Sequence, residues 1–284
     1  MEDLSSAAEA RTALEAAGAL PDAELDLAGV ALQFARIDAP AADWRAAERH
    51  LSELARAAVA AAAADPAADG GEVARRVALL AALLHERFGY AGDGETYDSP
   101  ANANLIEVIR RRRGLPVALG LLWLHAAGAA GWPAHGLDFP GHFLIGLEGA
   151  RGMAVVDPFH GGRLLEAPEL RALLKRMEGE AAELRPAVLE PVSRRAVLLR
   201  LQNNIKLRRL QAGDLPAALT CTEDMLRMAP EAAILWREAA VMNQRLDRIG
   251  AALACIDRFL ALVPRGEAAQ RARALAVELR QRLN

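Results

Sequence analysis

Apolar residues recur at every third or fourth position through the first third of the chain. The first such set is Leu27, Val30, Phe34 and Ile37. This spacing places the apolar side chains on one face and predicts a helix. Pro40 ends that helix, and Asp43 is suited to cap the next one, which continues through an Ala-rich stretch to Asp65. A third amphipathic helix ends near Gly89. We therefore predict a helical N-terminal part, residues 1–95, packed on a core.

The next block, residues 96–192, mixes helical and strand patterns. A helix is predicted to start at Ser99-Pro100 and to stop at Gly114, because Ser caps helices and Pro suits their first turn. A second helix, about 117–130, is apolar on nearly every side and should be the central helix of this block. Three strand-like segments follow: Ala134–Phe139, His142–Leu147 and Met153–Asp157. Their alternation predicts an antiparallel sheet packed on the central helix, so the fold class is α+β and mostly helical.

From about residue 193 the pattern changes to helix pairs that repeat with an offset of 34 residues. The aligned pairs are Ala217 and Ala251, Cys221 and Cys255, Leu226 and Leu260, and Pro230 and Pro264. Small residues where helices cross and a Pro after each second helix are typical of the tetratricopeptide repeat. We predict that residues 193–284 hold two repeats and a terminal helix. Such repeats present a concave surface to extended segments, which predicts a protein or peptide partner.

Charge argues against a nucleic-acid partner. The 284 residues carry 34 basic and 37 acidic side chains, for a formal net charge of −3. No global positive field therefore exists to hold a polyanion. The basic run Arg110–Arg113 complements the dipole at a predicted helix end and has no interleaved aromatic residues. We predict that the protein does not bind nucleic acid.

The sequence also predicts a cytoplasmic protein without membrane contact. Its first residues include Glu2 and Asp3 rather than a basic start followed by an apolar run. The most apolar window, Leu115–Trp132, falls short of the roughly 20 apolar residues that span a bilayer. The two cysteines are too few for a disulfide framework.

A set of short motifs carries a resemblance to a known family. The motifs are Tyr97, Asn104-Leu105, Arg112-Arg113-Gly114-Leu115-Pro116, Phe139-Pro140-Gly141-His142-Phe143-Leu144, Asp157-Pro158-Phe159, Gly161-Gly162 and Asn203-Asn204. From about residue 25 to 284 the chain resembles the bacterial SirB-one family, in which a transglutaminase-like domain precedes tetratricopeptide repeats. The resemblance implies a papain-like α+β core. Active transglutaminase-like proteins use Cys, His and Asp in this core, with the Cys at the start of the central helix.

The nucleophile that this chemistry requires is missing here. Matching Gly114 to the glycine before the usual Cys puts the nucleophile at or near Pro116, and neither Val117 nor Ala118 supplies a thiol or hydroxyl. The reaction depends on that group, because the helix N-terminus favours its thiolate, the His takes its proton and the Asp holds the His tautomer. His142 and Asp157 are therefore interpreted as remnants of a degenerate triad.

Two roles are open for His142 and Asp157. In one, they belong to a polar pocket at the helix start that binds a small anion, a carboxylate or phosphate. In the other, they form a structural hydrogen bond that fixes the edge of the sheet. The other candidate binding residues, taken from the family motifs, are Asn104, Arg113, Phe139, Asn203 and Asn204.

Four residues of metal-ligand type lie close together in the sequence. They are His135, His142, Asp157 and His160. They lack a closely spaced pair such as HxH or HExxH, and strand alternation leaves the faces of His135 and His142 unsettled. From the sequence we predict no metal site and no cofactor.

The predicted function is that of a non-catalytic adaptor or regulator. Its repeats would bind a protein or peptide partner. The degenerate pocket of the core would help to bind this partner or to stabilise the protein. The alternative is a residual, cysteine-independent hydrolase or transamidase, in which His142 acts as base on water or on a nucleophile brought from elsewhere. An anion-binding pocket protein using His142 and Asp157 is the third interpretation.

Overall fold

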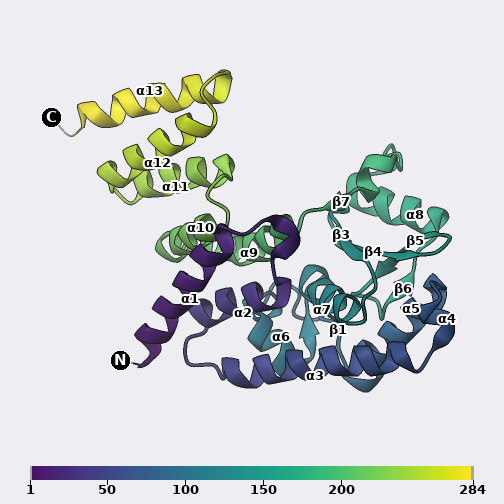
Figure 1. The fold of residues 1–284 in the computed structure, drawn as a ribbon. Helices are drawn as coiled ribbons and strands as arrows, with labels where there is room; N and C mark the ends of the chain where they lie inside the picture. The colour runs from purple at the N-terminus through teal and green to yellow at the C-terminus, as the bar shows by residue number, and fades with distance from the viewer. Residues whose placement is uncertain (1, 283–284) are drawn as a thin grey trace. The chain divides into compact units, whose positions relative to one another are not determined.

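A computed structural model gives the structure of residues 2–282, with side chains from residue 6 onward. The chain divides into two compact units, which are described separately below. The core unit holds the chain up to Ala10 together with Pro21–Leu201, and the repeat unit holds Arg11–Leu20 and the chain from Gln202 onward. The division falls inside two helices, α1 (Glu2–Gly18) and α9 (Arg194–Gln211) (Figure 1).

The helices predicted in the N-terminal part of the core unit are present. They are α2 (Leu27–Asp38), α3 (Trp44–Ala63) and α5 (Val73–Ala81), with the shorter element η1 (Asp22–Glu24) before α2 and α4 (Pro66–Asp69) between α3 and α5. Asp43 caps α3 as predicted, since its side chain accepts a hydrogen bond from the Ala46 amide at 2.9 Å. The third helix differs from the prediction, because its last part is the π-helical turn η2 (Ala82–Arg87).

The helix predicted from Ser99 to Gly114 is wrong as a continuous element. Pro100–Asn102 forms a single 3-10 turn, η3, and the Ser99 side chain makes no capping hydrogen bond. The helix proper, α6 (Leu105–Arg111), is capped by Asn104, whose side-chain oxygen accepts from the amides of Ile106 and Glu107. Asn104 therefore starts a new helix where the prediction continued the old one.

The central helix is α7 (Pro116–Ala129), which is buried along nearly its whole length, as the apolar sequence predicts. The segments after it form a five-stranded sheet in the order β6-β5-β4-β3-β7, with antiparallel neighbours. The strands are β3 (Ala134–Leu137), β4 (Leu144–Gly149), β5 (Gly152–Asp157), β6 (Arg163–Leu164) and β7 (Pro191–Val192). The α+β fold class is thus confirmed.

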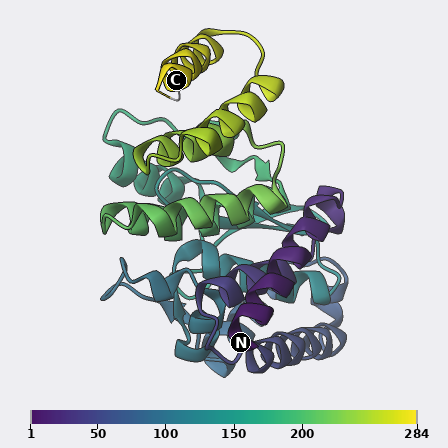
Figure 2. The same cartoon turned by 90° about the vertical axis from the view of Figure 1, so that its left-hand side faces the viewer.

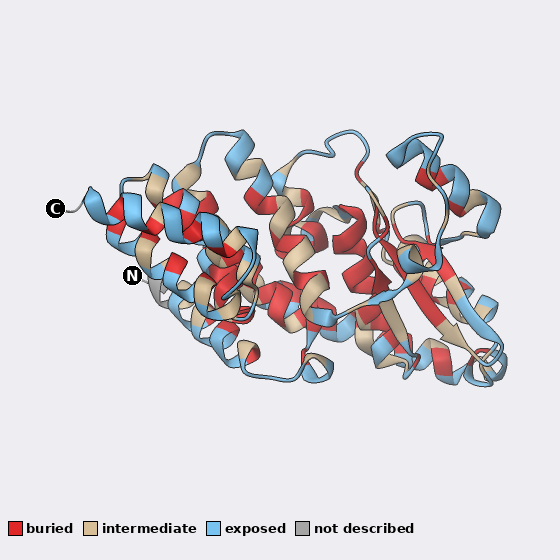
Figure 3. Ribbon diagram, turned by 90° about the horizontal axis from the view of Figure 1, so that it is seen from above, coloured by how far each residue is buried: buried red, intermediate tan, exposed pale blue. Residues whose placement is uncertain are grey.

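A helix covers each face of the sheet. Neighbouring residues of a strand point to opposite sides, so one strand contacts both helices. On one side α7 approaches closely at Gly120, where a Cβ would lie 2.6 Å from the Phe143 ring and 3.2 Å from the Ile145 side chain. On the other side Leu144 belongs to a cluster with residues of α8 (Ala167–Glu178). Figure 3 shows the buried residues, in red, concentrated along the central helix and the strands beside it.

A short parallel ribbon leads into the central helix. Strand β1 (Ala91–Gly92) pairs with β2 (Arg113–Gly114), and Gly92 lies opposite Gly114. Gly92 donates its amide hydrogen to the Phe159 carbonyl at 3.2 Å. The segment after β5 is therefore joined through this ribbon to the start of α7.

The repeat unit contains the helices that the 34-residue offset predicts. They are α10 (Leu215–Met228), α11 (Ala233–Arg245), α12 (Ile249–Leu262) and α13 (Glu267–Gln281). The starts of α10 and α12 are 34 residues apart, as are those of α11 and α13. Figure 2 shows these helices, green to yellow, stacked one on the next. The unit also includes the second half of α1, in which Arg11 forms an ion pair with the buried Asp224 at 2.8 Å.

Candidate functional site

His142 lies in a turn between β3 and β4, held by its main chain. Gly141 has a φ of +66°, which favours glycine, and the His142 amide donates to the Phe139 carbonyl at 3.0 Å. The Arg200 guanidinium donates to the His142 carbonyl at 2.6 Å. The strand predicted to begin at His142 starts instead at Leu144, because the turn already uses the main-chain amide of His142.

Asp157 is the last residue of β5, and its carboxylate ties down the turn that follows. Oδ1 accepts from the amides of Phe159 at 2.9 Å and His160 at 3.3 Å. This is the local bonding by which Asp side chains favour turns. These main-chain hydrogen bonds thus fix the position of the carboxylate without a contribution from another side chain.

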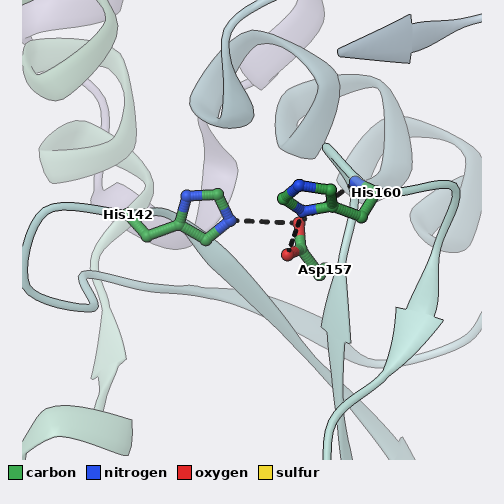
Figure 4. A group of neighbouring side chains, drawn as sticks. All are labelled: His142, Asp157 and His160. Carbon is green, nitrogen blue, oxygen red and sulfur yellow. Dashed lines mark hydrogen bonds and ion pairs between the residues drawn. The ribbon is translucent and has the colours of Figure 1, made fainter. Parts of the chain in front are cut away.

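Two imidazoles contact this carboxylate from different sides (Figure 4). His142 Nε2 lies 3.0 Å from Asp157 Oδ1, and His160 Nδ1 lies 2.8 Å from Asp157 Oδ2. The side chains of His142 and Asp157 are 7% and 5% exposed, whereas that of His160 is 62% exposed. The contact between His142 and Asp157 joins the two residues that the sequence singled out. Together with His160 they form a His–Asp chain of hydrogen bonds, which is buried at His142 and open to solvent at His160.

The two histidines favour the ionised form of Asp157. Burial alone would raise the pKa of this carboxyl group, but the hydrogen bonds and charges of His142 and His160 outweigh burial and hold the pKa below its ordinary value. Asp157 is therefore a carboxylate over the whole neutral range.

The aromatic ring of Phe159 lies beside the two histidines, and that of Tyr97 lies beside Phe159. Phe159 lies edge-on to His142 and to His160, with ring centroids 6.2 and 5.1 Å apart, and Tyr97 packs on Phe159 at 6.0 Å. No described residue bonds the second ring nitrogen of His142, Nδ1. His142 thus keeps one nitrogen for a group from outside the described chain.

The start of α7 offers no nucleophile. Pro116 is its first residue, and Pro116, Val117 and Ala118 are all buried and carry hydrocarbon side chains. The preceding Leu115 donates its amide hydrogen to the Asn102 carbonyl at 2.9 Å. The structure thus has a bonded His142–Asp157 pair, and it has no thiol or hydroxyl side chain at Pro116 or the next two residues.

The other candidate binding residues have structural contacts. Asn104 uses its oxygen as a helix cap and its amide nitrogen on the Ala35 carbonyl and Asp38. Arg113 is exposed and donates to the carbonyls of Gly89 and Arg112. These contacts hold Asn104 within the fold and leave Arg113 exposed, and the binding roles of both residues remain predictions.

The remaining candidates are Phe139, which packs in the core, and Asn203 and Asn204, which belong to the repeat unit. Phe139 is fully buried in the cluster between the sheet and α8. Asn203 and Asn204 are half-buried on α9, and Asn204 accepts hydrogen bonds from Arg208 through its carbonyl and side-chain oxygens. Their binding roles remain predictions.

Three of the four residues considered as metal ligands come together, and one does not. The ligand atoms of His142, Asp157 and His160 all lie within 4.8 Å of one another. His135 is on β3, where its ring nitrogens face Met153 Sδ at 3.1 Å and Glu148 at 3.7 Å. The fold therefore selects the three residues that flank the β4–β5 hairpin.

Arg200 was not found from the sequence. Besides the His142 carbonyl, it contacts Asp138 in an ion pair and lies 5.8 Å from the Phe143 ring centroid. It holds the turn that carries His142. Nothing in its local sequence distinguishes it from other arginines, because its partners lie about 60 residues earlier in the chain.

Two cavities lie outside the His–Asp chain. One, of about 810 Å³ in the core unit, is lined by residues that include Trp132, His135 and Arg194. The other, of about 290 Å³ in the repeat unit, lies among α11, α12 and α13. It is lined by Arg237, Ala240, Val241, Ile256, Phe259, Ala268, Arg271, Ala272 and Leu275. We call the second cavity the repeat groove.

None of the helices in the described part of the chain is both long and apolar enough to cross a bilayer. This result concerns residues 2–282. A cytoplasmic location stays a prediction.

Similarity to known proteins covers both units. A family model described as the transglutaminase-like superfamily matches residues 45–203, and a tetratricopeptide repeat model matches residues 205–277. A UPF0162 protein of Xylella fastidiosa (strain Temecula1) is 32% identical over 192 residues, which cover 66% of this chain and 68% of the relative. No solved structure matches the chain.

Two further relatives also match about two thirds or more of the chain. A UPF0162 protein of Pseudomonas aeruginosa is 32% identical over 217 residues, covering 76% of this chain and 77% of the relative. Protein SirB1 of Salmonella typhimurium is 25% identical over 186 residues, covering 65% and 69%. The family resemblance stated from the sequence motifs is thereby confirmed.

Proposed function

Because the chain belongs to the transglutaminase-like superfamily and carries tetratricopeptide repeats after the core, we propose that it is a non-catalytic adaptor that binds a protein partner. The observation that carries the proposal is Pro116 at the start of α7, where the family chemistry needs a nucleophile. A His and an Asp without that group have no attacking atom of their own.

The two cysteines of the chain do not replace the missing thiol. Both belong to the repeat unit, and burial raises the pKa of Cys221 to about 11 and also raises the pKa of Cys255. The reactive thiolate is therefore disfavoured at neutral pH. Their ordinary role is that of small apolar side chains between helices.

The repeat groove supports the binding part of the proposal. Its lining is mainly apolar, and two arginines, Arg237 and Arg271, stand among the lining residues. Val241 is exposed there although it is apolar. This combination suits a segment that inserts an apolar side chain and carries acidic residues beside it.

The test uses two matched valines on neighbouring repeat helices. Val241 lines the groove on α11 and Val277 lies on α13 outside the lining, and both are exposed. Full-length protein, V241D and V277D would be compared in quantitative affinity purification from the native bacterium. The adaptor role predicts a specific protein partner that is lost with V241D and retained with V277D. Equal recovery with both variants, or no enriched partner with the unchanged protein, would contradict it.

A residual hydrolase or transamidase is the second candidate. The favouring observation is the bond between His142 and Asp157, which would hold the imidazole in one tautomer while Nδ1 has no described partner. The attacking group would come from water or from a second substrate. Acyl-transfer assays on the unchanged protein and His142→Ala test this role, and equal background rates would exclude it.

A small-anion pocket at the start of α7 remains a further proposal for the same residues. It is supported by the unbonded His142 nitrogen and by the contacts that join the Phe159 turn to β1 and β2. Calorimetry with acetate and with phosphate on the unchanged protein and on His142→Ala would decide it. Heat that His142→Ala does not change would count against the pocket.

A further inference from the structure

The hydrogen-bonded cluster of His142, Asp157 and His160 suits a second role, which needs no nucleophile from the protein. We propose that these three side chains bind a divalent transition-metal ion of the zinc or cobalt type. Imidazole and carboxylate are the ligands such ions take, and three protein ligands are the number found in zinc sites that keep a position open. The inference is independent of the adaptor role of the repeats.

The spacing of the ligand atoms suits a single ion. With bonds of about 2.1 Å, ligand atoms of a tetrahedral site lie roughly 3.4 Å apart. Here His142 Nε2 lies 3.0 Å from Asp157 Oδ1 and His160 Nδ1 lies 2.8 Å from Asp157 Oδ2, and one ligand atom from each of the three residues lies within 4.8 Å of the other two. Small side-chain rotations therefore bring the three atoms onto one ion without moving the main chain.

The second layer of contacts holds the ligands in place. The Asp157 carboxylate receives two main-chain amides, and the turn carrying His142 is tied by Arg200 and by the Phe139 carbonyl. Such contacts fix the ligands' orientation and raise metal affinity. His142 and Asp157 are buried while His160 is exposed, so the site has a rigid floor and an open side toward solvent.

The charges and protons also balance. One carboxylate and two neutral imidazoles carry a net charge of −1 toward a divalent cation. Metal binding uses the nitrogens that now face Asp157, so the ring protons move to His142 Nδ1 and His160 Nε2, to which no described residue is bonded. No buried charge is left unpaired by the exchange.

The open position would hold water. In zinc sites with three protein ligands a bound water has a lowered pKa and can act as nucleophile. A metal at this site would therefore supply the type of group that Pro116 does not supply. The proposal itself concerns binding, and binding is what the experiment measures.

The test is a cobalt titration of tag-free, full-length protein after chelator treatment, followed by its visible absorption bands and by zinc calorimetry. His160→Ala is the informative variant, because this side chain is exposed and its loss spares the fold. His135→Ala is the matched control, since His135 lies outside the cluster. We expect one ion per chain, at least tenfold weaker binding with His160→Ala and unchanged binding with His135→Ala.

Asp157→Asn supplies a second variant, with circular dichroism to confirm that it folds. It should also weaken binding, because an amide is a poorer ligand than a carboxylate for such ions. Absence of stoichiometric binding by the unchanged protein would overturn the proposal. So would equal weakening by His160→Ala and His135→Ala, which would indicate adventitious binding to surface histidines only.

Discussion

The core unit and the repeat unit bury their side chains in different ways. In the core, α7 contacts α2 and α3, which lie far away in the sequence, as well as β3 and β4, and its Gly120 meets Phe143, which directly precedes β4. In the repeat unit each helix from α10 to α13 packs mainly on the next one. A disturbance in the core should therefore spread through the whole unit, whereas one in the repeats should stay near its origin.

The largest effect is expected where α7 crosses the sheet. Gly120→Val should lower the free energy of unfolding of the core by about 3 kcal/mol, because a Cβ there already lies 2.6 Å from the Phe143 ring. Hydrogen exchange should rise in α7 and in the strands together. Hydrogen exchange measured by mass spectrometry reports on the core unit and the repeat unit separately.

Gly128 on the same helix provides the control. A Cβ there meets nothing within 4 Å, so Gly128→Ala should be neutral or stabilise by up to about 1 kcal/mol. If both variants had the same effect, the tight crossing would not be what limits the size of residue 120.

An equivalent change in the repeats should act more locally. Ala252→Leu inserts a larger side chain into the fully buried cluster of α11, α12 and α13 and should cost about 2 kcal/mol. Exchange should rise in these helices and stay unchanged in the sheet. Gly250→Ala, with free space around its Cβ, is the control. Faster exchange in the sheet as well would remove the contrast between the two units.

The third effect depends on pH and lies in the core. Asp93 is buried, and hydrogen bonds from Thr96, reinforced by Arg111, hold its pKa well below the ordinary value against the effect of burial. A carboxylate with a lowered pKa stabilises the fold above its unfolded-state pKa, and this contribution is lost as the pH falls.

Asp93→Asn should therefore lower stability by about 1 to 2 kcal/mol at neutral pH. The difference from the unchanged protein should shrink below about pH 4, where the unfolded carboxyl group takes up a proton. Urea unfolding at several pH values measures it. A difference in stability that is independent of pH would mean that Asp93→Asn acts through altered packing and not through loss of the carboxylate charge.

The smallest effect on stability is expected at the rim of the repeat groove. Arg271 pairs with Glu267 at 2.7 Å, and both side chains are more than two-thirds exposed, at 67% and 79%. Arg271→Gln should change stability by less than about 0.5 kcal/mol. Partner affinity should nevertheless fall if the groove binds an acidic segment. Unchanged affinity would place the partner elsewhere.

Much of the fold could be predicted because it follows from local patterns. The helical periods, the Asp43 cap and the 34-residue offset each depend on nearby residues, and the structure contains the corresponding elements. Helix α8 was missed although Glu166 and Glu169 form a capping box and Pro168 stands in the first turn. This signal is local, within four residues of the sequence.

Other parts of the fold could not be predicted from local patterns. Strands β1 and β2 have two residues each, too few for any periodicity, and their pairing depends on the tertiary fold. The division of α1 between two units likewise depends on long-range packing. The helix boundary shifted because Asn104 caps a new helix, whereas the Ser99 side chain makes no capping hydrogen bond.

For the site, the sequence identified His142 and Asp157 and named His160 among the residues of metal-ligand type, but it did not show that these three side chains meet. The contribution of His160 depends on the tight turn after β5, and that of Arg200 on a helix about 60 residues further along. The missing nucleophile, in contrast, could be read directly, because a side chain that is absent from the sequence cannot be restored by folding.

The ion pair between Arg11 and Asp224 has a consequence for how the protein is made. Its two residues are 213 positions apart, and both belong to the repeat unit. On the ribosome, residues 11–20 are synthesised before residues 21–201 of the core unit, whereas their partner helix α10 follows only after those residues have been translated. A segment that is synthesised before most of the core thus reaches its native place only after the core has been translated, and until then a chaperone has access to it.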